Sequence, residues 1–389
     1  MTSRERLLTV LNHKIPDRVP VSFYDMTGWY CDPFESKRSP AEKSLRNVFS
    51  TFLTGWWNQE PSYMPLMEYI RQKADCLFMT EIPTSNAYLQ KNTHVTQWKE
   101  GISTFTKIIT TTPKGDLTQI YRMDANVYTA WQIEHKIKDE KDIEKFLSIP
   151  FEPLPVDVSH IKTQDQFIGD NGILMIDIAD PICTVMDLFN FEDFSILAVA
   201  EQDTILRMLN KVFEEKKHFL KEMLQKGAGP LFRVFGPECC TPPFFPHEYF
   251  RKYVVDFDKP LIDLIHQHGQ LVRLHSHGKI KTVLRDILEM EVDALDPVEA
   301  PPSGDITLAE VKAACGGKVC LFGNIQLHDL EQLSATQMRK VVEQCVREGK
   351  PDGNFVALPT ATPINVPLSP RTEENLRIFL DTVLELGQY

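Results

Sequence analysis

Eight short apolar runs alternate with helix-like stretches along this chain of 389 residues. Short apolar runs bounded by turn residues predict buried strands. Because the runs alternate with helical patterns, they predict a closed parallel (β/α)8 barrel. An open, doubly wound sheet is the alternative, but no GxGxxG motif follows the first strand. The runs are Val19–Phe23, Cys76–Met79, Ile173–Ile176, Leu231–Phe235, Leu271–Leu274, Ala294–Leu295, Val319–Leu321 and Phe355–Leu358, and one of the helical stretches is Ser44–Phe52.

Residues 92–137 differ in character from the rest of the chain. They are rich in threonine, isoleucine, valine and aromatic residues, and Gly101 and Lys114-Gly115 interrupt them. Such a segment predicts an antiparallel hairpin or meander inserted into the main fold. No linker is visible, so residues 1–389 are expected to form a single domain that carries this insertion.

Charge and cysteine usage narrow the class of protein. The chain has 42 Lys and Arg against 54 Asp and Glu, and its net charge of −12 disfavours nucleic acid as a partner. No apolar run approaches the ~20 residues of a membrane span. The eight cysteines contain no CxxC pair, and the first residues lack the apolar core of a signal peptide, so a cytoplasmic protein with reduced thiols is expected. The oligomeric state stays open, with a homodimer as one alternative.

Two histidines follow the fifth apolar run at the predicted mouth of the barrel. His275 and His277 are two residues apart, so both side chains point the same way if the strand continues. Glu238 and Glu299 follow two neighbouring runs. Histidine and carboxylate ligands suit zinc, which predicts a metal site formed by these four residues. The alternative is that the histidines bind backbone groups or substrate only.

Other strand ends and the N-terminal aromatic residues are candidates for contacting a substrate. Asp177 follows the third run and Asn324 the seventh, and either a substrate contact or, for Asp177, a helix cap explains such a residue. The aromatic residues around Asp25 predict an apolar pocket that accepts a ring, with a tyrosine hydroxyl as hydrogen-bond donor; core packing is the alternative. The residues of this predicted pocket are Phe23, Tyr24, Asp25, Trp29 and Tyr30.

Several segments resemble uroporphyrinogen decarboxylase-like proteins. Ser3-Arg4-Glu5-Arg6 and Pro16-Asp17-Arg18-Val19-Pro20-Val21 are similar to the opening of that family, and Gly323-Asn324 to its late Gly-Asn. The resemblance implies a (β/α)8 barrel. It departs from true decarboxylases at Asp25–Tyr30, where both arginines of their R-Q-A-G-R-Y segment are missing, and an octacarboxylate substrate needs such cations.

The corrinoid-dependent methyltransferases of the same superfamily match better. His275-Ser276-His277-Gly278 resembles their zinc-binding H-x-C-G with histidine in place of cysteine, and the late cysteine expected near Thr360 is absent, which implies that Glu238 replaces it. The resemblance implies a zinc-dependent transfer of methyl from a small molecule, foremost a methoxylated aromatic, to a corrinoid carried by a partner protein. Tyr24, Tyr30 and Glu81 are the candidate acids for the leaving oxygen.

Other functions remain open at this stage. Transfer from a methylcorrinoid to a thiol or tetrahydrofolate is one alternative, and decarboxylation of a less acidic substrate is another. An inactive barrel that serves as a binding subunit is the alternative outside enzymes.

Overall fold

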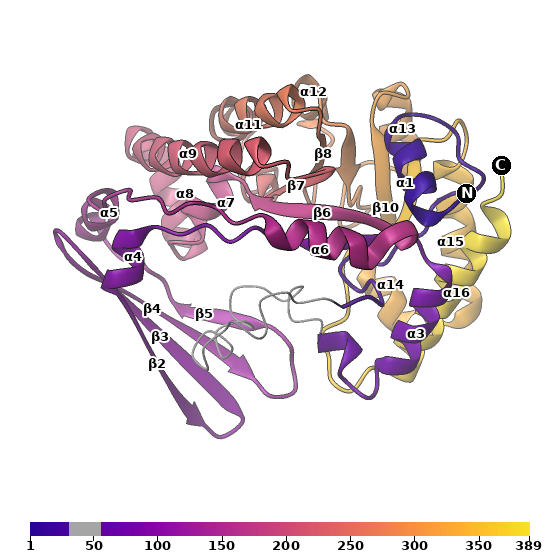
Figure 1. Ribbon diagram of the computed structural model, residues 1–389, viewed down its shortest axis with the longest axis horizontal. Coiled ribbons are helices and arrows are strands. Elements are labelled where there is room, and N and C mark those ends of the chain that lie inside the picture. Colours follow the sequence, from indigo (N-terminus) through magenta and orange to yellow (C-terminus); the bar gives the residue numbers. More distant parts are fainter. Residues whose placement is uncertain (31–55) are drawn as a thin grey trace.

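The computed structural model describes residues 1–30 and 56–389 and contains two sheets (Figure 1). The larger is a curled parallel sheet of seven strands that lie in chain order, each hydrogen-bonded to the next. Helices connect successive strands, as the alternation of patterns predicts. The strands are β1 (Cys76–Thr80), β6 (Gly172–Ala179), β7 (Leu231–Phe235), β8 (Leu271–His275), β9 (Ala294–Asp296), β10 (Cys320–Ile325) and β11 (Phe355–Pro359).

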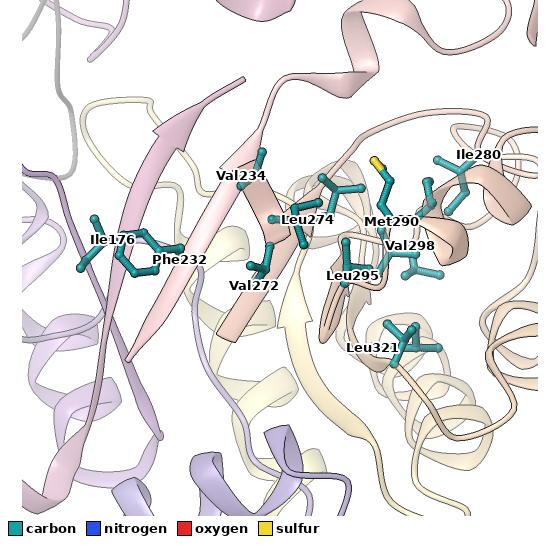
Figure 2. Close-up of a cluster of buried hydrophobic side chains, with 14 of the residues drawn as sticks. Ile176, Phe232, Val234, Val272, Leu274, Ile280, Met290, Leu295, Val298 and Leu321 are labelled. Carbon is teal, nitrogen blue, oxygen red and sulfur yellow. The ribbon is translucent and has the colours of Figure 1, made fainter. Parts of the chain in front are cut away.

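Both faces of this sheet are apolar, which explains why its strands read as continuous apolar runs. Alternate residues of one strand belong to different core clusters, since successive side chains point to opposite faces. On β6, Leu174 and Ile176 join the large outer cluster, whereas Ile173 and Met175 join the smaller inner one. Figure 2 shows part of the outer cluster, where residues of β6, β7 and β8 are followed by side chains as far along the chain as Leu321 of β10.

The first apolar run, Val19–Phe23, does not form a strand. Val21 makes one isolated parallel bridge to Ala357 of β11, and its carbonyl accepts a hydrogen bond of 2.7 Å from the backbone N–H of Asp75, just before β1. The segment therefore lies between the two outer strands of the sheet. A regular ladder is prevented because Pro20 has no N–H and the N–H of Val21 donates to the carboxylate of Asp75 at 2.9 Å. The prediction of a closed eight-stranded barrel is thus borne out only as a curled seven-stranded sheet.

The predicted insertion is an antiparallel sheet of four strands in the order β2-β3-β4-β5. Its strands are β2 (Thr93–Glu100), β3 (Ser103–Thr112), β4 (Gly115–Asp124) and β5 (Ala130–Glu134), and Figure 1 shows it projecting from the parallel sheet at the lower left. Gly101 and Gly115, with φ of +58° and +119°, stand at the two tight turns, where other residues would be strained.

The helices surround the parallel sheet (Figure 1). Three of them, α4, α8 and α14, have no counterpart among the sequence predictions, and the predicted helix Ser44–Phe52 lies outside the described residues. No helix in the described part of the chain is long and apolar enough to cross a membrane. The helices are α1 (Ser3–Leu11), α3 (Met64–Lys73), α4 (Ala87–Asn92), α5 (Glu140–Leu147), α6 (Ser159–Ile168), α7 (Pro181–Met186), α8 (Phe191–Ala200), α9 (Gln202–Gln225), α10 (His247–Phe250), α11 (Asp256–Gln267), α12 (Leu284–Glu289), α13 (Leu308–Cys315), α14 (Leu327–Gln332), α15 (Ala335–Gly349) and α16 (Pro370–Leu386), with short 3-10 turns η3 (Trp56–Asn58), η4 (Gly169–Asn171) and η5 (Pro237–Cys240) and a π-helical turn η6 (Arg251–Val255).

Candidate active site

His275, the last residue of β8, is held by a buried carboxylate on the neighbouring strand. The sheet register pairs His275 with Asp296 of β9, and their Nδ1 and Oδ2 atoms lie 2.6 Å apart. Asp296 also forms a two-pronged ion pair with Arg273, which precedes His275 by two residues on the same face of β8. Both partners of this pair are fully enclosed, with Asp296 0% and Arg273 1% exposed.

Burial and the neighbouring charges together fix the protonation state of His275. Burial by itself would raise the pKa of Asp296, but Arg273 and His275 hold it well below its usual range. Burial lowers the pKa of His275 to about 4, against the pull of Asp296. At neutral pH the imidazole is therefore neutral and the carboxylate is ionised. Nδ1 must carry the proton that it donates to Asp296, which leaves the lone pair on Nε2.

Tyr24 occupies that lone pair. Its hydroxyl oxygen lies 3.1 Å from Nε2 of His275, and burial raises the pKa of Tyr24, so the hydroxyl stays protonated and donates. Nη1 of Arg233 on β7 donates to the same oxygen at 2.5 Å. Arg233 is in turn paired with Asp177 at the end of β6 through two hydrogen bonds of 2.6 and 2.8 Å. One continuous chain of hydrogen bonds thus runs from Asp177 to His275.

The backbone of Tyr24 is unusual for a residue with a large side chain. Its φ of +39° lies in the left-handed region, which costs free energy for any residue but glycine. Such a conformation persists only where the surroundings hold it. Here the hydroxyl accepts a hydrogen bond from Arg233 and donates one to His275, and these two bonds fix the position of the side chain.

His277 has a carboxylate partner of its own. Its Nδ1 lies 3.2 Å from Oε1 of Glu299, whose second oxygen accepts a hydrogen bond of 2.7 Å from the backbone N–H of Gly278. Burial opposes protonation of His277, but the hydrogen bond to Glu299 and the negative charges of Glu299, Glu238 and Asp296 together raise its pKa. The rings of His275 and His277 lie edge to face with centroids 4.7 Å apart. Glu299 is therefore placed as the partner of His277.

Glu238 lies in the 3-10 turn η5 that follows β7. Its Oε2 is buried and has no hydrogen-bond partner among the described residues. Burial raises the pKa of this carboxyl group, and His277 acts in the opposite direction. The turn depends on Gly236, whose φ is +125° and where a Cβ atom would lie 2.3 Å from Cβ of Cys183. An unsatisfied buried carboxylate oxygen calls for a proton, a donor or a cation.

The donor types of this site fit zinc, while its present geometry is not that of a formed metal centre. Across residues 1–30 and 56–389, no three His, Cys, Asp or Glu side chains converge as a ready metal-binding group. However, Asp296 and Glu299 each hold the Nδ1 of one histidine, which is how carboxylates orient metal-binding imidazoles. The Nε2 atoms of His275 and His277 and the free oxygen of Glu238 are then the candidate ligands, and zinc stays a prediction.

The remaining predicted residues occupy several places. Asp25 accepts a hydrogen bond of 2.8 Å from Thr362, and burial raises its pKa to about 6. Phe23 packs in the core against Phe379, with ring centroids 5.3 Å apart. Trp29 makes an edge contact with Phe167 at 5.6 Å.

Three more predicted residues lie near the ends of elements. The backbone carbonyl of Glu81, next after β1, lies 3.0 Å from Nε2 of His160. Asn324 on β10 lines a cavity of about 360 Å³ beside α15, and Tyr30 is half-buried. The substrate-binding and catalytic roles of all six residues stay predictions.

Two residues of the site escape detection in the sequence. Arg233 and Arg273 lie inside apolar runs, Leu231–Phe235 and Leu271–Leu274, and so look like interruptions in buried strands. The available signal is that each is the third residue of its run, followed by one apolar residue and then the strand end. A charged residue in an otherwise apolar strand needs a buried partner, which predicts a charge on the neighbouring strand.

The sequence profile of uroporphyrinogen decarboxylase (URO-D) matches residues 119–386. The chain belongs to the uroporphyrinogen decarboxylase family. The match contains Arg233, Glu238, His275 and Asp296, whereas Tyr24 lies before it. Among curated proteins, no match is found.

Solved structures share the fold at low sequence identity. A methyltransferase from Methanosarcina mazei is 14% identical, with 99% of each chain covered and a TM-score of 0.59. The 3-keto-D-glucoside 4-epimerase from E. coli is 12% identical over 58% of this chain and 95% of its own, with a TM-score of 0.32. The first likeness indicates a common fold, and the second is too distant to support an argument.

Proposed function

We propose that this chain is a methyltransferase that moves a methyl group from a small methylated molecule, foremost a methoxylated aromatic, to the cobalt of a corrinoid carried by a partner protein. The observation that carries the proposal is the protonated hydroxyl of Tyr24, held between Arg233 and His275. Membership of the family and the shared fold with a methyltransferase support it.

Tyr24 is the best-placed acid for the leaving oxygen. When the methyl–oxygen bond of an aryl ether breaks, the oxygen keeps the electron pair and needs a proton. Tyr24 carries that proton at neutral pH, and Arg233 at 2.5 Å stabilises the phenolate that remains. Of the three candidate acids, Tyr24 is the one for which the structure gives a contact with His275. The corrinoid supplies the nucleophile, so the protein has to position the ether and deliver the proton.

His275, His277 and Glu238 are the residues that would hold zinc. A bound zinc ion supplies a Lewis acid that draws electron density from the ether oxygen. The chain contributes the orientation of its ligands, because Asp296 and Glu299 fix the two imidazoles through Nδ1. Glu238 contributes an oxygen that has no partner of its own in the described chain.

The paired arginines argue against a tetrapyrrole decarboxylase. Arg233 and Arg273 are each bound by a carboxylate of the protein through two hydrogen bonds, from Asp177 and Asp296. Neither arginine is therefore left without a counter-charge to bind a carboxylate of the substrate. A substrate with many carboxylates needs unpaired cations, and Asp25 next to this network adds an acidic group instead. A neutral or weakly charged donor suits such a mouth better.

The test is a methyl-transfer assay with matched tyrosine variants. Purified protein is mixed with a reduced corrinoid protein and methoxybenzoates, and the methyl-cobalt absorbance is followed. We expect turnover with the wild type and a loss of about 10²–10⁴-fold with Tyr24→Phe. Tyr63→Phe, which removes a buried hydroxyl that donates to the carbonyl of Asn365, should retain activity. A wild type that produces no methyl-cobalt, or Tyr24→Phe with full activity, would refute the proposal.

A further inference from the structure

A second cavity lies between the ends of β1 and β6 and helix α9. Its volume is about 370 Å³, within the range of sites for small molecules. Phe219, Leu220 and Met223 of α9 provide apolar walls, together with Ile82 of the loop after β1. Lys216, one turn before Phe219 and Leu220 on the same helix, lines the same cavity.

Lys216 is the charged group of this cavity without an ion pair. It is half-buried, and within the described chain it has neither a hydrogen bond nor an ion pair. Asp180 and Asp258 act on it from a distance, and neither lies within ion-pair range. Burial lowers the pKa of Lys216, as expected for an ammonium group removed from water with no anion in direct contact. Such a group is stabilised when an anion enters.

The acidic groups of the cavity do not compensate Lys216. Asp177 lines the cavity, but Arg233 already matches its charge with two hydrogen bonds. Glu81 also lines the cavity and has contacts of its own, without an ion pair to Lys216. The cavity thus places one ammonium group that has no ion pair beside the apolar side chains of α9. A single ammonium group suits a singly charged carboxylate, whereas a phosphate group recruits several donors or an arginine fork.

We propose that Lys216 binds the carboxylate of a small aromatic acid whose ring packs against Phe219 and Leu220. This binding site is separate from the contact between Tyr24 and His275, and the pair of Asp177 and Arg233 stands between them. A methoxybenzoate methyl donor is one ligand of this class, and only that assignment rests on the function proposed above. Binding of the carboxylate does not depend on it.

The experiment measures binding without turnover. Benzoate, 4-methoxybenzoate and methoxybenzene are titrated into the full-length protein by calorimetry. We expect both carboxylates to bind and methoxybenzene to bind at least about tenfold more weakly. Lys216→Met should lose at least about tenfold in affinity for benzoate, the equivalent of one charged hydrogen bond. Lys216→Arg should keep most of the affinity, because the positive charge remains.

Lys217→Met is the matched control. Lys217 is exposed on the same helix, with its ammonium group 5.2 Å from the ring of Phe213, so benzoate binding should not change. Equal benzoate affinity of the wild type and Lys216→Met would overturn the proposal, as would a folded wild type that binds no benzoate. If Lys216→Met lowers the melting temperature and leaves benzoate binding intact, the role of Lys216 is to stabilise the charge of buried Asp258, and the proposal is also wrong. Benzoate binding without methyl transfer would refute the proposed function and leave this site standing.

Discussion

The hydroxyl of Tyr24 donates to Nε2 of His275, the same nitrogen through which His275 would bind zinc. A hydroxyl proton and a metal ion cannot share one lone pair, so the two compete. Tyr24→Phe should therefore bind zinc roughly three- to tenfold more tightly, the equivalent of one displaced hydrogen bond, even while methyl transfer slows. Competition with a chromophoric chelator measures the affinity, and Tyr63→Phe is the control. An unchanged zinc affinity would show that Tyr24 does not compete with the metal for Nε2. A weaker zinc affinity would show that Tyr24 is itself a zinc ligand.

Replacing Asp296 should be costly for the fold. Asp296→Asn leaves the fully buried Arg273 without a counter-charge, which typically costs about 3–5 kcal/mol in the free energy of unfolding. Urea titration provides the measurement. Glu385→Gln, which breaks an exposed pair with Arg339, should change the free energy of unfolding far less, because solvent screens that pair. If both variants were equally stable, the buried pair would not be a stabilising feature.

Asp25 predicts an inverted dependence of stability on pH. Its folded pKa of about 6 lies above the ordinary value, so the folded protein keeps a proton that the unfolded chain releases. Stability from this residue is thus lost as pH rises from about 4 to 6. Compared with Asp25→Asn, the wild type should lose about 1–2 kcal/mol of its free energy of unfolding over that pH range. This is less than the full pKa shift would give, because the side chain is only half-buried and solvent weakens the effect. Parallel curves for both proteins would contradict the assignment.

Gly236 should be intolerant of a side chain. In Gly236→Ala the new Cβ would lie 2.3 Å from Cβ of Cys183 and 2.5 Å from Oδ1 of Asp180, the atom that caps α7. Strain and the lost cap together should cost about 3 kcal/mol or more, measured by thermal and urea unfolding. Gly101→Ala meets no atom within 4 Å, so only its positive φ matters and the cost should be about 1 kcal/mol. Similar costs for the two would show that the loop of Gly236 yields.

The sequence predicts at which edge of the sheet the candidate site residues gather, but it does not predict which side chains the histidines contact there. His275, His277, Glu238 and Asp177 all follow apolar runs, and parallel strands bring their ends together, so the location could be predicted from periodicity. The choice between Asp296 and Glu299 as neighbours of His275 could not. It depends on the register between β8 and β9, which pairs His275 with Asp296 and which no local pattern encodes.

For Val19–Phe23 the sequence predicts a strand that the structure does not contain. Its composition is that of a buried strand, and it does lie beside β11, yet it makes one bridge instead of a ladder. Proline at position 20 and the carboxylate of Asp75 remove the donors that a ladder needs, and the second of these is a contact between distant residues. By contrast, the meander of residues 92–137 was predictable because its pairing is local and its turns carry glycine.

The bridge between Val21 and Ala357 has a consequence for the order of folding. It joins residues near opposite ends of the chain, so it closes a far longer loop than any hairpin of β2–β5 and carries a larger entropic cost. Chains rich in such distant pairings fold slowly. We expect a refolding intermediate in which the amide hydrogens of β3 and β4 are already protected from exchange. In the same intermediate the amide of Ala357, which donates a hydrogen bond to the carbonyl of Pro20 in the native protein, should still exchange freely.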